Sequence, residues 1–203
     1  MNKKINPWPH FLFDETFSHE DFLAIQQIML RWPKPEPGGR IVEDLINLPN
    51  SEFILDKLKR QIYPILLQVA AANFPTCILK RPENFRFSSL MYKTEYNIQA
   101  KGHIYKIHCD SSNKLVSIIT HVSNEGVGTH LYDERQNLSC TLPWKPNSSF
   151  LFTNSHNSFH SFSSDVNYRV TLTSTLELTE RAFNYFSAQS VERGFQRTTW
   201  WLE

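Results

Sequence analysis

The sequence predicts an α+β protein in which helices pack on one sheet of an antiparallel sandwich. Two observations support this class: stretches of helical periodicity occupy the first 75 residues, and a run of short alternating segments follows them. Helices and strands that are segregated along a chain are typical of α+β folds. A chain of 203 residues suits one domain, which buries about 70% of the surface of the unfolded chain. We therefore expect a single domain over residues 1–203, with a helical part over about 15–75 and a strand-rich core over about 85–178.

The first helix follows Ser18, whose hydroxyl can accept a hydrogen bond from a free backbone N–H group of the first turn. Apolar residues then recur every three or four positions, which marks the buried stripe of an amphipathic helix; they are Phe22, Ile25, Ile28, Met29 and Trp32. Because proline disrupts a helix interior, we expect this helix to end before Pro33.

Residues 33–50 are rich in proline and glycine, which predicts an irregular segment. Long segments without regular structure are uncommon in compact domains unless they are functional or disordered. Arg40, Glu43 and Asp44 supply polar groups that can meet a substrate. We hypothesise a mobile lid over the substrate pocket, and an ordinary surface connection is the alternative.

Helical spacing returns over residues 52–74, with Pro64 inside the stretch, so a kink or a break near Tyr63 is expected. Residues 85–92 alternate as a strand does, and residues 94–102 resemble a hairpin or a loop. A last helix is expected over about 179–195. Trp200 and Trp201 close the chain, and we expect them to pack back on the domain.

Candidate metal ligands concentrate in the second half of the chain. His108 and Asp110 lie at a strand end, where residues i and i+2 point to the same face, and His160 lies in a later alternating segment. Two histidines and one carboxylate on one face of a metal suit a non-haem Fe(II) oxygenase. His156 competes with His160 for the metal because it lies only four residues earlier.

A basic side chain follows on the strand predicted for residues 167–176. Arg169 shares one face of that strand with Thr171, Thr173 and Thr175, whereas the other face is largely apolar. The cation therefore lies on the polar face, which we expect to point into the mouth of a barrel.

These segments together resemble the prolyl-hydroxylase-like branch of the Fe(II)- and 2-oxoglutarate-dependent dioxygenases. The resemblance covers roughly residues 7–178, and the segments that carry it are His108-Cys-Asp110, Lys114-Leu-Val, Gly128-Thr-His-Leu-Tyr132, Pro146-Asn147, Ser158-Phe-His160 and Arg169. It implies a jelly-roll core, also called a double-stranded β-helix, in which His108, Asp110 and His160 bind Fe(II). It also implies that Arg169 pairs with the far carboxylate of 2-oxoglutarate, and the nine-residue gap before Arg169 favours His160 over His156.

Two further cosubstrate contacts follow from the same resemblance. Related enzymes often place a tyrosine on the strand after the His-x-Asp triplet, and the register here offers His121. Thr171, on the face of Arg169, is the second candidate. For His121 the alternative is a histidine satisfied by backbone groups in the barrel wall.

The resemblance implies an enzyme that uses O2 and couples oxidative decarboxylation of 2-oxoglutarate to hydroxylation of a substrate. Asp110 favours hydroxylation, because halogenating relatives lack this carboxylate. The alternative is a non-catalytic double-stranded β-helix module that binds a sugar or another small ligand, and Arg169 favours the enzyme. The substrate stays open between a peptidyl side chain, a free amino acid and a glycan or lipid precursor, and so does the oligomeric state.

Composition argues against several partners and compartments. A net charge of +1 supplies no basic field for nucleic acid. No run of about 18 apolar residues suggests a membrane span, and no signal-like apolar segment follows Lys3 and Lys4. Cys77, Cys109 and Cys140 are too few and too scattered for a disulfide framework. We expect a cytoplasmic protein that acts on a small-molecule or peptide substrate.

Overall fold

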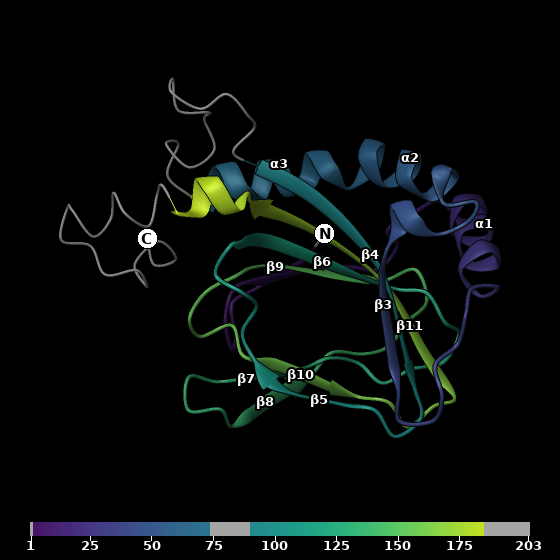
Figure 1. Cartoon of the computed structure of the whole chain (residues 1–203). Coiled ribbons are helices and arrows are strands. Elements are labelled where there is room, and N and C mark those ends of the chain that lie inside the picture. The colour runs from purple at the N-terminus through teal and green to yellow at the C-terminus, as the bar shows by residue number, and fades with distance from the viewer. Residues whose placement is uncertain (1, 74–89, 185–203) are drawn as a thin grey trace.

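The computed structural model describes residues 2–73 and 90–184, and these residues form two antiparallel sheets that face each other (Figure 1). The larger sheet has the strand order β1 (Asn2–Lys4), β2 (His10–Phe13), β9 (Ser149–Thr153), β6 (Lys114–His121), β11 (Tyr168–Leu178), β4 (Leu90–Ala100) and β3 (Arg40–Asp44). The smaller sheet has the order β5 (Ile104–His108), β10 (His160–Ser163), β7 (His130–Tyr132) and β8 (Leu138–Thr141). The α+β class with antiparallel sheets is confirmed.

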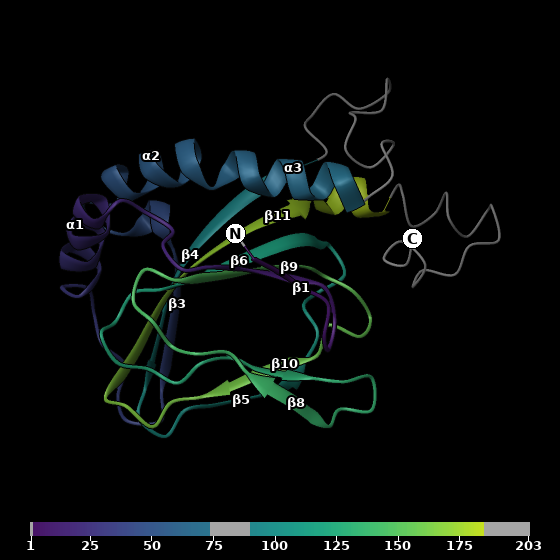
Figure 2. The same cartoon turned by 180° about the vertical axis from the view of Figure 1, so that it is seen from behind.

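Helices α1 (His19–Met29), α2 (Glu52–Gln61) and α3 (Tyr63–Asn73) lie along the side of the larger sheet that faces away from the smaller one (Figure 2). The Ser18 hydroxyl accepts a hydrogen bond from the Asp21 N–H, at 3.2 Å, and so caps α1 as predicted. The chain also breaks between α2 and α3, where Pro64 falls in the first turn of α3 and its missing N–H costs no hydrogen bond. No helix within residues 2–73 and 90–184 is long and apolar enough to cross a membrane.

Alternation along β11 and β4 separates an apolar core from a polar interior. Outward-facing residues of the two strands, among them Ile98 and Leu172, pack with the helices in the main hydrophobic core. The inward-facing residues are mostly polar, and the register pairs Arg169 with Gln99 and Thr171 with Asn97. The space between the sheets is therefore suited to polar ligands rather than to further hydrophobic packing.

The prediction of an irregular segment at 33–50 is wrong for the second half of that segment. Residues 40–44 form the edge strand β3, which pairs with β4, and a 3-10 helix follows at Leu45–Asn47. Leu45 is fully buried, and the Trp32 indole donates a hydrogen bond to the Pro49 carbonyl. These contacts hold the segment against the sheet, so the hypothesis of a mobile lid over all of 33–50 does not agree with the structure.

The hairpin or loop expected at 94–102 is also wrong, because β4 continues to Ala100 and only a short turn follows. Pairing with β11 on one side and β3 on the other satisfies the backbone groups of this stretch. Leu90, Met91 and Tyr92 belong to β4, whereas the rest of the strand expected at 85–92 lies outside the described residues. Residues 180–184 are helical, and the remainder of the expected C-terminal helix, with Trp200 and Trp201, also lies outside them.

Candidate active site

Three potential metal ligands converge where the two sheets face each other. His108 ends β5, Asp110 follows in the adjoining loop, and His160 begins β10, which pairs with β5 and sets His160 opposite His108. One ligand atom from each of the three residues lies within 4.8 Å of the others. Within the described parts of the chain, no other group of three or more His, Cys, Asp or Glu side chains meets this criterion, and His156 is not part of it.

Hydrogen bonds fix which atom of each histidine is available to a metal. The Nδ1 atoms of His108 and His160 lie 2.9 Å from the carbonyl oxygens of Lys106 and Ser158. A carbonyl oxygen only accepts, so Nδ1 carries the proton and Nε2 keeps a free lone pair. Metal-binding histidines commonly donate their other N–H in this way, which fixes the orientation of the ring.

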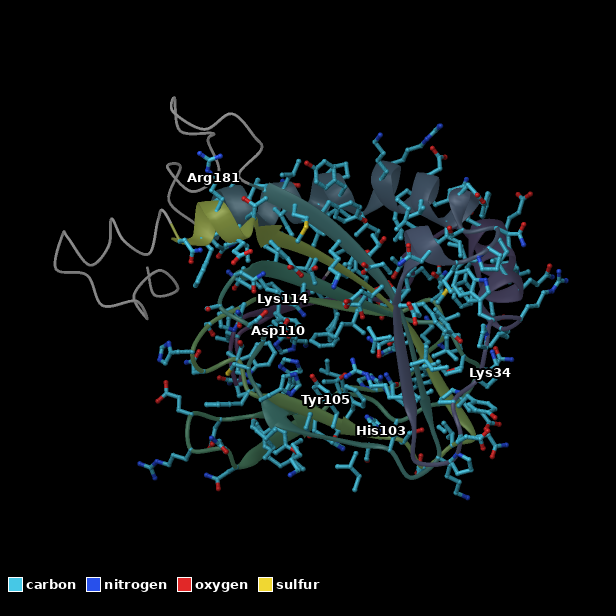
Figure 3. All side chains as sticks on the ribbon, in the orientation of Figure 1. Lys34, His103, Tyr105, Asp110, Lys114 and Arg181 are labelled. Carbon is cyan, nitrogen blue, oxygen red and sulfur yellow. The ribbon has the colours of Figure 1, made fainter. Side chains whose placement is uncertain are left out.

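Asp110 is held by two polar neighbours on β6. Its Oδ2 accepts a hydrogen bond from the Ser117 hydroxyl at 2.8 Å, and the Lys114 ammonium lies 3.5 Å from Oδ1. Figure 3 shows Asp110 and Lys114 close together on the side of the larger sheet that faces the smaller one. Burial opposes ionisation of Asp110, but the charge of Lys114, the neighbouring His160 and the hydrogen bond from Ser117 together outweigh it, and the pKa of this carboxyl is lowered.

The histidines of the triad are neutral at physiological pH. Burial, together with the neighbouring His160, lowers the pKa of His108 to about 4. Burial also lowers the pKa of His160. Because metal binding requires neutral imidazoles and an ionised carboxylate, the triad is already in its binding state at neutral pH.

Arg169 is the largest of the fully buried side chains, with 1% of its surface exposed. Its Nε donates to the Val127 carbonyl at 3.0 Å, and its Nη1 donates to Gln99 Oε1 at 3.0 Å. Its guanidinium lies 4.2 Å from the centre of the Phe162 ring. No carboxylate among the described residues forms an ion pair with it.

The charge of Arg169 is therefore not neutralised by the described part of the chain. Burial, together with the charge of Arg40, lowers the pKa of Arg169 to about 9, so the guanidinium remains a cation at neutral pH. A buried charge is costly unless it is paired. The position is thus ready for an anionic ligand.

His121 offers a second group without a partner. Its Nδ1 lies 3.1 Å from the Ser148 hydroxyl, which itself donates to the Lys145 carbonyl at 2.6 Å, so Nδ1 is the donor of this pair. Its Nε2 is buried and has no hydrogen-bond partner. The surrounding residues therefore satisfy Nδ1 of His121 but leave Nε2 without a partner. Thr171 is buried beside it, because β11 pairs Thr171 with His121.

His121 should make the stability of the metal-free protein depend on pH. Burial, together with the charge of Arg169, lowers its pKa to about 3, against about 6.5 in the unfolded chain. Below pH 6.5 this histidine is protonated in the unfolded chain but stays neutral in the folded protein, so the free energy of unfolding falls as the pH falls. From pH 6.5 to 5 this histidine accounts for a loss of about 2 kcal/mol.

Urea denaturation at the two pH values measures this loss. We expect His121→Gln to lose less stability than the wild type over the same interval. His19→Gln, at the exposed start of α1, is the control and should keep the wild-type dependence. Equal pH dependence of the wild type and His121→Gln would contradict the assignment.

Comparison with known proteins gives no match by sequence: no protein-family model matches the chain, and neither does any curated protein. Solved structures do match. A prolyl hydroxylase from Trichoplax adhaerens, in complex with a peptide fragment of the hypoxia inducible factor oxygen degradation domain, has a TM-score of 0.63 at 11% identity, over 88% of this chain and 87% of its own. An oxidoreductase of the 2OG-Fe(II) oxygenase family from Burkholderia pseudomallei has a TM-score of 0.59 at 13% identity, over 83% of this chain and 84% of its own.

HygX from Streptomyces hygroscopicus, with nickel, 2-oxoglutarate and hygromycin B bound, has a TM-score of 0.55 at 11% identity, over 84% of this chain and 83% of its own. The chain has the fold of the 2-oxoglutarate- and Fe(II)-dependent oxygenases. This confirms, at the level of the fold, the resemblance inferred from the sequence.

Within this oxygenase fold, the sequence analysis missed residues that contact the predicted ones. Gln99 holds Arg169, and Tyr105 packs edge-on against His108 with ring centres 4.3 Å apart. Gln99 lies in the stretch expected to be a hairpin or a loop, although Tyr96 and Ile98 alternate with polar residues as apolar residues do in a strand. Tyr105 precedes His108 by three residues, and no local pattern indicates that its ring turns toward the site.

Proposed function

We propose that the protein is an oxygenase that couples oxidative decarboxylation of 2-oxoglutarate at an Fe(II) centre to hydroxylation of a substrate. The observation that carries this proposal is the presence of two complementary features between the same two sheets. One is the metal-binding triad His108, Asp110 and His160, and the other is the buried, unpaired cation Arg169. We propose in addition that the two antiparallel sheets form the jelly-roll core expected from the sequence.

The triad fits Fe(II) by its donor set. His108 and His160 would bind through Nε2 and Asp110 through a carboxylate oxygen, which leaves other positions open for ligands. When bound, Fe(II) with 2-oxoglutarate and O2 supplies the oxidising chemistry of the reaction. The Ser117 hydroxyl and the Lys106 and Ser158 carbonyls keep the three ligands oriented.

Arg169 fits the far carboxylate of 2-oxoglutarate, because a guanidinium can hold a carboxylate through two parallel hydrogen bonds. Its bonds to Val127 and Gln99, and its contact with Phe162, fix its position before the cosubstrate arrives. Thr171 follows Arg169 by two residues on β11, so the two side chains share a face of the sheet, and Thr171 pairs with His121 on β6. We assign Thr171 and His121 as further cosubstrate contacts.

His121 would act as an acceptor in this arrangement. Its free Nε2 has a lone pair, so it accepts a hydrogen bond or takes up a proton when a carboxylate comes near. A tyrosine at this position would donate instead. A donor on the cosubstrate or on a bridging water would give the buried Nε2 the partner that it lacks.

Turnover of 2-oxoglutarate tests the proposed function. Purified protein with Fe(II), 2-oxoglutarate and O2 is expected to form succinate, and omission of the metal or of O2 should abolish this. Addition of the true substrate should increase the rate. Binding of 2-oxoglutarate without any succinate formation in the presence of candidate substrates would favour the non-catalytic binding module instead.

A further inference from the structure

A second arginine, Arg40 on the edge strand β3, lies beside the candidate active site. The strand register places Arg40, Gln99 and Arg169 in one row across β3, β4 and β11. Side chains in such a row project from the same face of a sheet, so both arginines belong to the polar inner face. They differ in exposure, because Arg169 is buried whereas Arg40 is partly exposed at the edge.

An amide pair separates the two arginines and holds them both. The Arg40 Nε donates to Asn97 Oδ1 at 2.9 Å, and the same oxygen accepts a hydrogen bond from Gln99 Nε2 at 2.7 Å. Gln99 Oε1 in turn accepts from Arg169 Nη1. Each guanidinium is thus held by its own hydrogen bond, Arg40 by Asn97 and Arg169 by Gln99.

Aromatic contacts connect Arg40 to the metal-binding triad. Its guanidinium lies 4.5 Å from the centre of the Tyr105 ring, and that ring packs edge-on against His108 at 4.3 Å. Figure 3 shows Tyr105 on the smaller sheet, directed toward the space between the sheets. One aromatic ring therefore separates the Arg40 guanidinium from a proposed metal ligand.

The charge of Arg40 has no acidic partner among the described residues. The carboxylates of Asp44 and Glu95 lie four residues further along β3 and β4 and pair with Lys93, whose ammonium is 3.5 Å from Asp44 and 2.7 Å from Glu95. No described residue accepts a hydrogen bond from Nη1 or Nη2 of Arg40. A guanidinium that is anchored through Nε and stacked on a ring presents its two Nη groups as a ready pair of donors for an oxyanion.

We propose that Arg40 binds an anionic group, a carboxylate or a phosphate, of the substrate that is oxidised. This inference rests on the proposed function, because it takes the triad as the reacting centre and Arg169 as the subsite of the cosubstrate. An anion held at Arg40 directs the remainder of the substrate across Tyr105 toward His108. The two anions then bind at arginines that differ in burial: the cosubstrate binds at the buried Arg169, and the substrate binds at the partly exposed Arg40 on the edge strand.

Binding of small anions to the Zn(II)-loaded protein in saturating 2-oxoglutarate tests this assignment. Zn(II) prevents turnover, and the cosubstrate occupies Arg169. Ligand-observed NMR then compares benzoate, its neutral analogue benzamide, and inorganic phosphate. We expect one of the anions to bind and benzamide to bind at least about tenfold more weakly, and the preferred anion distinguishes a carboxylate from a phosphate substrate.

Variants connect the binding to Arg40. Arg40→Gln, which keeps a planar polar end, should weaken the preferred anion by about tenfold, which corresponds to loss of one charge-assisted contact. Arg31→Gln is the matched control, because Arg31 is exposed near the end of α1 and should leave the affinity unchanged. Circular dichroism checks that each variant is folded.

Three results would overturn the proposal. The first is failure of both anions to bind the wild type, and the second is equal affinity in the wild type and Arg40→Gln. The third is a loss of 2-oxoglutarate affinity in Arg40→Gln as large as in Arg169→Gln, which would assign Arg40 to the cosubstrate. A wild-type protein that binds neither Zn(II) nor 2-oxoglutarate would instead defeat the proposed function. Comparison of anion binding by the unloaded wild type and the unloaded Arg40→Gln variant would then still report on Arg40.

Discussion

Replacing His160 by alanine is expected to abolish the visible charge-transfer band that Fe(II) and 2-oxoglutarate together give under anaerobic conditions. Neither Fe(II) nor 2-oxoglutarate alone should produce this band in the wild type. The expectation follows from geometry, since His108, Asp110 and His160 bring their ligand atoms within 4.8 Å of one another. Loss of a partner that only orients a ligand typically costs 10- to 100-fold in metal affinity, so loss of a ligand should cost at least about 100-fold.

Two variants serve as controls for this experiment. His156→Ala should keep the band, because His156 is not in the group that can hold the metal. Ser117→Ala should give an intermediate result, with metal affinity reduced by roughly tenfold, because Ser117 only orients the Asp110 carboxylate. If His160→Ala kept the band while His156→Ala lost it, the choice of the distal ligand would be wrong.

Replacing Arg169 by alanine is expected to weaken 2-oxoglutarate binding by roughly 30-fold or more. Leaving one member of a desolvated charge pair alone costs about 2 to 5 kcal/mol, and each 1.4 kcal/mol corresponds to a factor of ten. Arg169 is 1% exposed and has no carboxylate partner among the described residues, so the cosubstrate is the anion that would complete the pair. Binding of Fe(II) alone should largely survive, since Arg169 is not part of the triad.

Titration calorimetry of the metal-loaded variants measures this effect. Arg169→Lys should lie between the wild type and Arg169→Ala, because an ammonium keeps the charge but not the paired geometry of the guanidinium. Arg181→Ala, on the far side of the larger sheet in Figure 3, is the control and should bind 2-oxoglutarate like the wild type. An unchanged affinity in Arg169→Ala would remove the main argument for 2-oxoglutarate as the cosubstrate.

The local patterns of the sequence predict much of this site. His108 and Asp110 are two residues apart at a strand end, and the alternation of β11 places Arg169 on the polar face. Periodicity of this kind depends on the backbone of one segment only, so it can be read without knowing the partner strands. The caps and breaks of the helices, such as Ser18 and Pro64, are local for the same reason.

The strand pairing of the 33–50 and 94–102 segments was not predictable in this way. Glycine and proline near Arg40, and glycine after Ala100, indicate irregular backbone, whereas pairing between β3 and β4 supplies the hydrogen bonds that hold both as strands. Tertiary context overrides local preference here, as it often does for strands. Gln99 and Asn97 were missed because they belong to this pairing.

The pairing of His108 with Asp110 on one strand face, and the position of Arg169 on the polar face of its strand, could be predicted from the sequence, because each depends on spacing within one segment. The fold was needed to show that His108 and His160 lie opposite each other, that Gln99 holds Arg169, and that Arg40 contacts Tyr105. It also decided that the Arg169 charge has no carboxylate partner in the described part of the chain and that His121 Nε2 is free. Pairing and desolvation depend on neighbours from distant segments, and the alternation along one strand indicates which face is buried but not which strand lies beside it.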